Sequence, residues 1–294
     1  MTNTLGSVGF FTPYYQENRG NATTAKRMEY GLKQKGLHVE MFAHEEEEWT
    51  EEAKERLEAC DVYHILHFFR FADWSSEIPN RPYIITNGGT DVNHHLFESE
   101  QDRISRVKTL VDGAEALAVF SEDGKSKTIK ALGLSSEKVH VIPQSVWVPE
   151  GSSTKKPEMP KGCPRFLLPA GLRPVKDVLF LLDELAELRE TFRELQFVLI
   201  GSVLDDKVYR KVQMAEQQYE WFHYGGEVPL AEMKTWYDWA DVVLNTSVSE
   251  GQSSALLEAM ALGKLVAARE NPGNESVVSN GDNGFLYHSG EEFL

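Results

Sequence analysis

The stretch Ser249-Glu-Gly-Gln-Ser-Ser-Ala-Leu-Leu-Glu-Ala-Met260 decides the interpretation of the chain, because a polar turn in it leads directly into an apolar helix. Just before it, Asp241-Val-Val-Leu-Asn245 has the β-branched, apolar character of a buried strand. Residues 246–254 are small and polar, as in a loop. The stretch therefore predicts a strand, loop and helix unit. In a parallel sheet such a loop lies at the carboxyl end of its strand, where ligands bind.

Two glutamates frame this unit, Glu250 in the loop and Glu258 in the helix. Glu258 is the only ionisable residue between Ala255 and Leu262, so we expect a half-buried carboxylate that needs hydrogen-bond donors, such as sugar hydroxyls. From the helix alone an alternative stays open, in which Glu258 pairs with a basic side chain or reaches water. An anion, most simply phosphate, suits the unpaired amides at the helix start, which belong to Gly251, Gln252, Ser253 and Ser254.

The spacing of Glu250 and Glu258 resembles the signature of the family-four retaining glycosyltransferases, which use nucleotide sugars and have the GT-B fold. Upstream, the family's basic donor-diphosphate segment is similar to Ala170-Gly-Leu-Arg-Pro-Val-Lys-Asp177. Downstream, its next strand and loop are similar to Gly263-Lys-Leu-Val-Ala-Ala268 and Pro272-Gly-Asn274. The resemblance covers essentially the whole chain.

Two further segments narrow the resemblance to the glycosyltransferase 1 domain-containing protein 1 group. They are Gly20-Asn-Ala-Thr-Thr-Ala-Lys-Arg27 and Gly88-Gly-Thr-Asp-Val-Asn93. In the resembling family the first of these lies near the acceptor and the donor phosphates, which makes Gly20 and Asn21 candidate donor-binding residues. The resemblance also implies contacts with acceptor or sugar hydroxyls from Thr24, Gly89, Thr90, Asp91 and Asn93. For Asn21, Asp91 and Asn93 the alternative role is capping a helix.

The resemblance implies an α/β, GT-B architecture of two Rossmann-like, doubly wound domains that face each other across a cleft. Alternating strand and helix patterns along the chain favour the same class. Residues 148–164 are rich in Pro, Gly and Ser and lack apolar periodicity, so we expect a linker between an acceptor-side domain at 1–147 and a donor domain at 165–294. Family members continue with further helices after the segment that matches Gly290–Leu294, so we expect missing C-terminal helices and loosely held domains.

Several local expectations follow from the same patterns. A helix should run from Gly20 to about Lys35, with Asn21 as its N-cap. The run Glu45–Glu48 should form a solvated face of a surface helix at 44–59. A strand should cover 62–69, including His64 and His67, and a helix should cover 178–189.

Arg173 and Lys176 should follow a strand end and precede a helix, where two cations can neutralise a diphosphate leaving group. The alternative is a pair of solvated loop charges, and the resemblance favours the phosphate role. The family places its arginine directly after the glycine, whereas Gly171-Leu-Arg173 shifts it, so the diphosphate oxygen that Arg173 reaches stays open. The sequence contains no Asp-x-Asp, the acidic pair that holds a divalent cation in metal-dependent transferases, so we expect neither a metal nor a cofactor.

Composition limits the remaining function classes. The 294 residues are 41% hydrophobic and 26% charged, which is enough for one large or two ordinary domains. The formal net charge of −16 argues against a nucleic-acid partner. Cys60 and Cys163 lack a metal-ligand pattern and suggest free thiols in a reducing compartment. No signal or membrane-spanning run is evident, so we expect a cytoplasmic protein without a transmembrane segment.

The resemblance therefore implies a metal-independent transfer of a hexosyl-type sugar, with retention, from a nucleoside-diphosphate sugar to an unknown acceptor. A UDP-sugar is the favoured donor. Arg173, Lys176 and Glu250 would act in catalysis, and Glu258 would hold the ribose. Two alternatives are a non-catalytic nucleotide-sugar binder and a glycosidase or sugar-phosphate hydrolase that uses Glu250 and Glu258 as acid and base.

Overall fold

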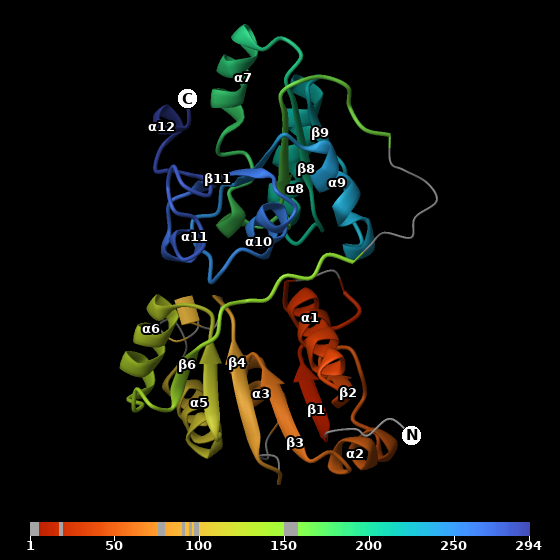
Figure 1. The fold of residues 1–294 in the computed structure, drawn as a ribbon, viewed down its shortest axis with the longest axis vertical. Coiled ribbons are helices and arrows are strands. Elements are labelled where there is room, and N and C mark those ends of the chain that lie inside the picture. Colours follow the sequence, from red (N-terminus) through yellow and green to blue (C-terminus); the bar gives the residue numbers. More distant parts are fainter. Residues whose placement is uncertain are drawn as a thin grey trace. The chain divides into compact units, whose positions relative to one another are not determined.

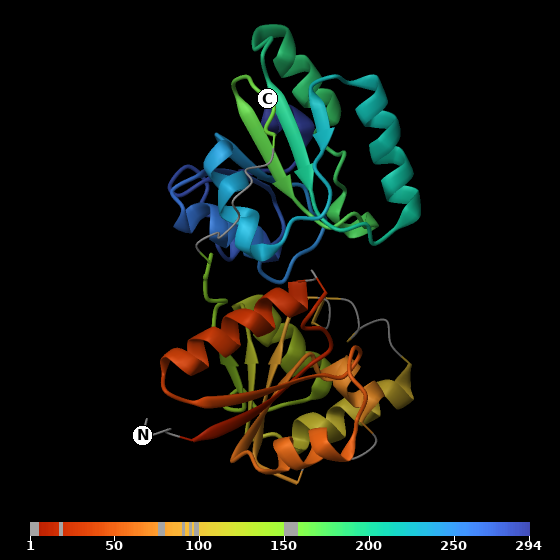
Figure 2. The same cartoon turned by 90° about the vertical axis from the view of Figure 1, so that its right-hand side faces the viewer.

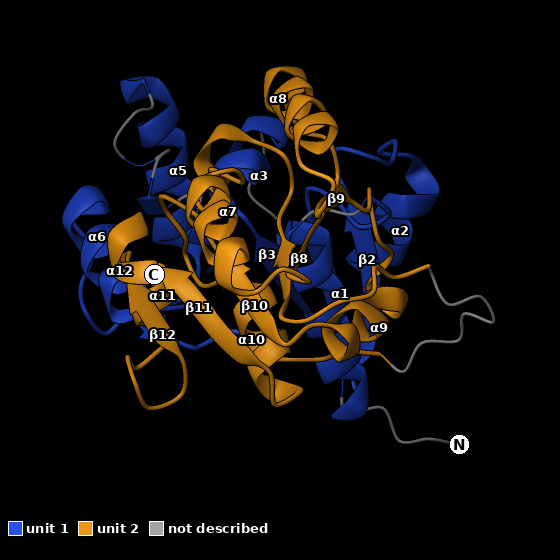
Figure 3. Cartoon of the chain, turned by 90° about the horizontal axis from the view of Figure 1, so that it is seen from above, with its two compact units in different colours: residues 1–145 blue, residues 146–294 orange. Residues whose placement is uncertain are grey.

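The structure, a computed structural model, describes residues 6–17, 20–75, 80–89, 92–93, 96, 100–149 and 158–294. The chain divides into two compact units, residues 1–145 and 146–294 (Figure 3). Each unit is built around its own six-stranded sheet, and the recorded strand pairs of both sheets are parallel (Figure 1). Residues 150–157 of the predicted linker lie outside the described residues.

The first unit alternates strands and helices around a sheet of order β2-β1-β3-β4-β5-β6. Its elements are β1 (Ser7–Thr12), α1 (Gly20–Gln34), β2 (His38–Ala43), α2 (Glu51–Glu58), β3 (Val62–Leu66), α3 (Phe68–Trp74), β4 (Tyr83–Asn87), α5 (Gln101–Gly113), β5 (Ala116–Val119), α6 (Glu122–Leu132) and β6 (Val139–Val141).

Successive residues of a strand point to opposite faces of this sheet, so each strand serves two cores. On one face, Phe11 and Ile65 pack with α2, α3 and α5 in a large buried cluster. On the other face, Phe10 and Leu66 pack against Ala25 of α1. Burial on both faces explains why the strands read as continuous apolar runs.

The second unit has the sheet order β12-β11-β10-β7-β8-β9, which is the doubly wound arrangement of a dinucleotide-binding domain. The chain first adds β8 and β9 on one side of β7. It then returns and adds β10, β11 and β12 on the other side. Its elements are β7 (Arg165–Pro169), η2 (Pro174–Lys176), α7 (Leu182–Thr191), β8 (Gln196–Ile200), α8 (Asp206–Gln218), β9 (Phe222–Tyr224), η3 (Leu230–Glu232), α9 (Met233–Trp239), β10 (Val242–Asn245), α10 (Ser254–Ala261), β11 (Leu265–Arg269), α11 (Pro272–Glu275), β12 (Phe285–Tyr287) and α12 (Gly290–Phe293).

Helices cover both faces of this sheet as well (Figure 2). Phe166 and Leu168 pack with Leu185 of α7 and with α8. The intervening residue, Leu167, packs on the opposite face with α9 and with Leu256 of α10. The apolar character of α10 follows from this position, because the helix packs against the sheet near β7 and β10, where the strand order reverses.

Three sequence-based boundaries differ from the structure. The predicted strand at 62–69 ends at Leu66, because His67 adopts a left-handed φ of 78° and turns the chain into α3. The predicted helix at 178–189 begins only at Leu182. The predicted helix at 44–59 begins at Glu51, where Thr50 accepts a hydrogen bond from the backbone N–H of Ala53 and caps the helix.

The solvated role predicted for the Glu45–Glu48 run is wrong for Glu46. Its carboxylate accepts backbone N–H groups of Tyr15 and Gln16 at 2.8 Å and of Glu17 at 3.0 Å. Burial would raise the pKa of Glu46, but these hydrogen bonds to the ionised form lower it overall. Glu46 therefore holds the loop that follows β1.

Within the described ranges, no helix has the length and apolar character that crossing a bilayer requires.

Gly201 shows how tightly the strand ends of the second unit approach each other. Its φ is +151°, and a Cβ there would lie 2.1 Å from the carbonyl oxygen of Ala170. We expect Gly201→Ala to lower the free energy of unfolding by at least about 3 kcal/mol, because both the backbone conformation and the contact oppose a side chain. That loss corresponds to a decrease in Tm of roughly 6 °C or more, measured by calorimetry.

Gly226→Ala is the matched control for this prediction. Gly226 also has a positive φ, +74°, but nothing lies within 4 Å of its added Cβ. Its substitution should cost only the left-handed backbone term of about 1–2 kcal/mol. Equal losses in the two variants would show that the approach of Gly201 to Ala170 has no energetic consequence.

Candidate active site

The candidate site lies where β7 and β10 run side by side, at the point where the sheet order reverses. These strands pair in parallel through Phe166 and Val242, so the loops that follow them leave the same edge of the sheet. Hydrogen bonds to backbone carbonyls join the loops: Thr246 Oγ1 donates to the carbonyl of Lys176 at 2.8 Å, and Val248 N–H donates to the carbonyl of Val175 at 2.9 Å. Ligands of doubly wound sheets bind at this type of position.

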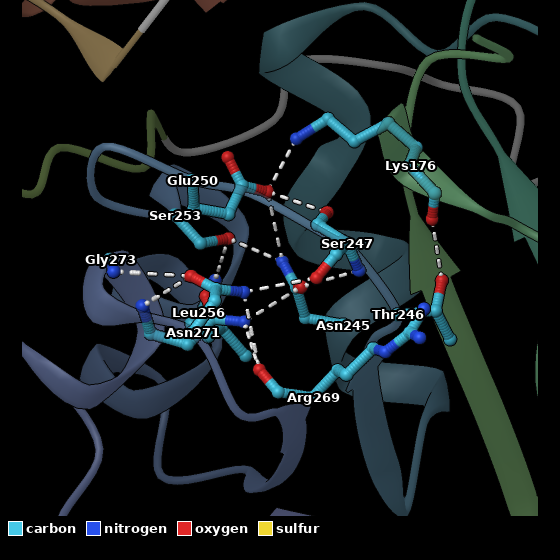
Figure 4. Close-up of polar contacts among 11 residues, drawn as sticks. Lys176, Asn245, Thr246, Ser247, Glu250, Ser253, Leu256, Arg269, Asn271 and Gly273 are labelled. Carbon is cyan, nitrogen blue, oxygen red and sulfur yellow. Dashed lines mark hydrogen bonds and ion pairs between the residues drawn. The ribbon is translucent and has the colours of Figure 1, made fainter. Parts of the chain in front are cut away.

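Glu250 and Lys176 form an ion pair across the two loops (Figure 4). The Oε1 atom of Glu250 accepts hydrogen bonds from Lys176 Nζ, from Ser247 Oγ at 2.8 Å and from Asn245 Nδ2 at 3.2 Å. Both charged side chains are largely buried, with 17% of Lys176 and 11% of Glu250 exposed. The structure thus brings together two of the three residues that were predicted to act in catalysis.

Burial and pairing act on the pKa of Glu250 in opposite directions. Burial, the largest single influence, would raise the pKa of this carboxyl. The positive charge of Lys176, together with hydrogen bonds from Lys176, Ser247 and Asn245, outweighs burial and lowers the pKa below its usual value. Glu250 is therefore ionised at neutral pH.

Arg173 stands on the same loop as Lys176, immediately before the single turn of η2. Pro174 occupies the first position of that turn and fixes its start. Within the described residues Arg173 takes part in no ion pair, in contrast to Lys176. The positive charge of Lys176 is therefore offset by a carboxylate, whereas no carboxylate among the described residues offsets the charge of Arg173.

Arg269 supports the end of this basic loop. It pairs with Asp177 at 2.9 Å, and its guanidinium lies 3.9 Å from the centre of the Phe180 ring. Asp177 adopts a left-handed φ of 41°, which turns the chain directly after Lys176. Sequence reasoning missed Arg269, whose partner lies 92 residues earlier in the chain.

The start of α10 carries the residues predicted to present amides to a phosphate. Ser253 precedes the helix, and its Oγ accepts the backbone N–H of Leu256 at 3.5 Å while Ser254 opens the helix. Gln252 is buried and its amide donates to Ser276 Oγ at 3.4 Å. Gly251 is half-buried in the loop between them and Glu250.

The loop after β11 closes on the other side of Glu250. A Cβ on Gly273 would lie 2.3 Å from the carbonyl oxygen of Glu250, so only glycine permits this contact. Asn271 caps α11 by accepting the backbone N–H groups of Gly273 and Asn274, each at 3.1 Å. Asn271 Nδ2 also donates to the carbonyl of Ser247 at 3.0 Å, which ties this loop to the one that carries Glu250.

Glu258 is buried on α10, with 4% of its surface exposed. Its Oε2 atom accepts a hydrogen bond from the hydroxyl of Tyr237, which is itself fully buried on α9. The need for a donor was predicted from the sequence, but the identity of Tyr237 was not. A tyrosine in an apolar helix stretch gives no signal of its partner, because the two residues meet only in the folded core.

Three candidate residues of the first unit lie on α1. The helix begins at Gly20, so Asn21 lies within its first turn and the N-cap role predicted for Asn21 is wrong. Thr24 Oγ1 donates to the carbonyl of Gly20 at 2.9 Å and contacts Gln144 Oε1 at 3.3 Å. Gly20 is exposed, with nothing within 4 Å of an added Cβ.

The remaining candidates follow β4. Gly89 is half-buried, and Asn93 Oδ1 accepts a hydrogen bond from Lys127 Nζ at 2.9 Å. Thr90 and Asp91 lie outside the described residues.

The fold is the GT-B architecture, with a parallel six-stranded α/β sheet in each unit. The structure is similar to that of Anabaena HepE in complex with UDP and glucose, with a TM-score of 0.74 and 17% identity over 98% of this chain and 88% of that one. It is also similar to the catalytic domain of starch synthase IV from Arabidopsis thaliana bound to ADP and acarbose, with a TM-score of 0.71 and 14% identity over 98% of this chain and 90% of that one. At these identities the likeness shows the fold, and the predicted GT-B architecture is confirmed.

Sequence comparison gives the family. Residues 163–293 match the family model "Glycosyl transferases group 1". Glycosyltransferase 1 domain-containing protein 1 of Xenopus tropicalis is 26% identical over 298 residues, which cover 97% of this chain and 84% of that protein. Alpha-monoglucosyldiacylglycerol synthase of Acholeplasma laidlawii is 27% identical over 128 residues, 44% of this chain and 32% of that protein. The predicted resemblance to glycosyltransferases is therefore confirmed, for the second unit by the family model and for nearly the whole chain by the Xenopus protein.

Replacement of Glu250 tests the energetic role of the ion pair. Glu250→Gln leaves the largely buried ammonium of Lys176 without its counter-charge, so at neutral pH we expect a loss of roughly 3 kcal/mol in the free energy of unfolding. A carboxyl whose pKa is lowered by folding stabilises the protein above its unfolded pKa, and this contribution is lost as the pH falls through the folded pKa. The difference between wild type and variant should therefore shrink in acid, as measured by denaturant unfolding at several pH values.

Glu190→Gln is the control, because Glu190 lies on the exposed surface of the same unit. It should change the stability little at any pH. A constant difference between wild type and Glu250→Gln from neutral to acidic pH would contradict the assignment of the stabilisation to the ionised pair.

Proposed function

We propose that the protein is a retaining glycosyltransferase that moves a hexose-type sugar from a nucleoside-diphosphate sugar to an acceptor hydroxyl without a divalent metal. The observation that carries the proposal is the Lys176–Glu250 pair at the switch point of the second sheet, with Arg173, which forms no ion pair with the described residues, on the same loop as Lys176. HepE has been solved with UDP and with UDP-glucose, which supports a UDP-sugar as donor.

In the proposed reaction the bond between the anomeric carbon and the diphosphate breaks while a bond to the acceptor oxygen forms on the same face. The departing phosphate takes the proton of the acceptor hydroxyl, so no separate base is needed. Arg173 and Lys176 stabilise the charge that develops on the diphosphate, where preorganised donors have their largest effect. The sequence offers no Asp-x-Asp to hold a metal for that purpose.

The remaining residues of the second unit position the donor. Glu258 binds the ribose hydroxyls, and Glu250 orients the hydroxyls of the transferred sugar. The amides of Gly251 to Ser254 face the diphosphate at the start of α10. We assign residues 165–294 to the donor domain and residues 148–164 to the linker.

The first unit, residues 1–147 in this scheme, supplies the acceptor side. Gly20 and Asn21 would contact the donor phosphates from the start of α1. The acceptor or the transferred sugar would contact Thr24, Gly89, Thr90, Asp91 and Asn93.

In a glycoside hydrolase that uses Glu250 and Glu258 as acid and base, the electrostatics of Glu250 disfavour it as the acid. A general acid needs a raised pKa, whereas Lys176 and the neighbouring donors lower the pKa of Glu250. A non-catalytic nucleotide-sugar binder remains the second candidate. It would bind the donor but release no nucleoside diphosphate with any acceptor.

Substitutions of the two glutamates should affect nucleotide binding and turnover differently. Glu258→Gln weakens a contact made equally in the ground state and the transition state, so we expect UDP affinity to fall about tenfold. Glu250→Gln should reduce kcat more than it reduces nucleotide affinity. Affinity is measured by thermal shift, where a ligand at 100 times its Kd stabilises the fold by ~2.7 kcal/mol, and turnover by release of UDP. Equal and small effects of both variants would remove the glutamates from the mechanism.

We expect turnover to require Lys176 and to proceed without magnesium. Loss of one preorganised donor costs ~2.7–4 kcal/mol, so Lys176→Ala should be slower by roughly 10²–10³. Lys207→Ala, a change on the exposed surface of α8, should retain the wild-type rate. The assay is product formation with and without excess chelator. Wild-type activity that stops in chelator and returns with magnesium would overturn the metal-independent mechanism.

A further inference from the structure

A buried amide, that of Asn245, connects Glu250 to the loops around it. Asn245 ends β10 and is 5% exposed. Its Nδ2 donates to Glu250 Oε1 at 3.2 Å and to Ser253 Oγ at 3.0 Å. Its Oδ1 accepts the backbone N–H of Ser247 and Nδ2 of Asn274, each at 3.0 Å. The side chain thus uses both donors and both acceptor positions of its amide.

These partners allow only one orientation of the amide. The backbone N–H of Ser247 can only donate, so it must face the oxygen of Asn245. The nitrogen then faces Glu250, whose ionised carboxylate can only accept. Asn245 therefore presents a donor to Glu250 because other groups hold its acceptor elsewhere.

Asn274 strengthens this constraint from the loop after β11. Its Nδ2 donates to Asn245 Oδ1 and, at 2.8 Å, to the carbonyl of Arg269, so its orientation is fixed as well. Asn274 is fully buried, and its Oδ1 accepts no hydrogen bond within the described residues. An unsatisfied buried acceptor is unfavourable for folding, which indicates that the amide serves another purpose than its own stability.

We propose that Asn245 is a positioning residue, which aims the Glu250 carboxylate at the donor sugar, and that Asn274 holds Asn245 in the required orientation. This inference rests on the proposed function, in which Glu250 orients the transferred sugar. Asn271 offers an instructive contrast, because its amide caps α11 and its recorded hydrogen bonds all join backbone groups, the carbonyls of Ser247 and Arg269 among them.

Asn245→Asp is the most informative substitution. The introduced carboxyl has the size of the amide and still accepts from Ser247 and Asn274, so the loops keep their connections. What it loses is the Nδ2 donor that serves both Glu250 and Ser253, and toward Glu250 an ionised oxygen would face another ionised carboxylate. We expect kcat to fall about tenfold to a hundredfold, with the KM for the donor changing less than about threefold.

The pH dependence separates positioning from a general structural effect. Lys176 is the charged group that contacts the Glu250 carboxylate, and it favours the ionised form of Glu250. In Asn245→Asp a proton taken up in acid should therefore reside on the introduced carboxyl, which then donates to Glu250 again. Activity relative to wild type should recover as the pH falls. A constant relative activity across pH would overturn the proposal.

A direct titration tests the same idea without any substrate. The pKa of the Glu250 carboxyl, followed by carbon-13 NMR, should be higher in Asn274→Ala than in wild type, because the weakened hold on Asn245 weakens its hydrogen bond to Glu250. In Asn245→Asp the two carboxyls should titrate as a coupled pair. Unchanged titration of Glu250 in both variants would contradict the proposed link.

Asn283→Asp is the control, because it makes the same chemical change in an exposed loop of the same unit, where Asn283 accepts from Ser279 and donates to Val277. It should alter neither the titration of Glu250 nor the rate. If wild-type protein transfers no sugar from any nucleotide donor, the proposed function fails. The NMR titration still decides whether Asn245 controls Glu250.

Discussion

The attraction between Lys176 and Glu250 is the interaction on which the second unit depends. Opposite charges in a poorly solvated position are stable only together, and the loop after β10 also bonds Lys176 through Thr246 and Glu250 through Ser247. The pair therefore fixes the distance between the segments that follow β7 and β10. The order of the strands in the sheet makes these segments neighbours, although they are separated by 74 positions in the chain.

Sequence reasoning located most of this arrangement but not its supports. The unit from β10 to α10 was predictable because a short apolar run, a polar loop and an apolar helix follow one another. Arg173, Lys176 and Glu250 in the loops and Glu258 on α10 were found because their spacing resembles that of nucleotide-sugar transferases. Whether they bind a donor is a matter for experiment.

The residues that support the pair, such as Asn245, Asn274 and Arg269, were missed because their partners are far away in the sequence. Their residue types are also common in loops. Asparagine after a strand usually indicates a turn, so Asn245 and Asn274 gave no sign that they bond each other across 29 positions. Helices α3 and α5 of the first unit were missed as well. The predicted strand at 62–69 includes Phe68 and Phe69, which begin α3, and only the left-handed backbone of His67 separates the two elements.

The contact of Gly273 with the backbone of Glu250 has a consequence for how such a protein can change. Because no side chain fits between the two segments, the loop after β11 and the loop that carries Glu250 form one interlocking surface. Neither can be lengthened, shortened or exchanged with that of a relative while the other stays as it is. Attempts to alter sugar preference by loop grafting must therefore transplant both segments as a unit.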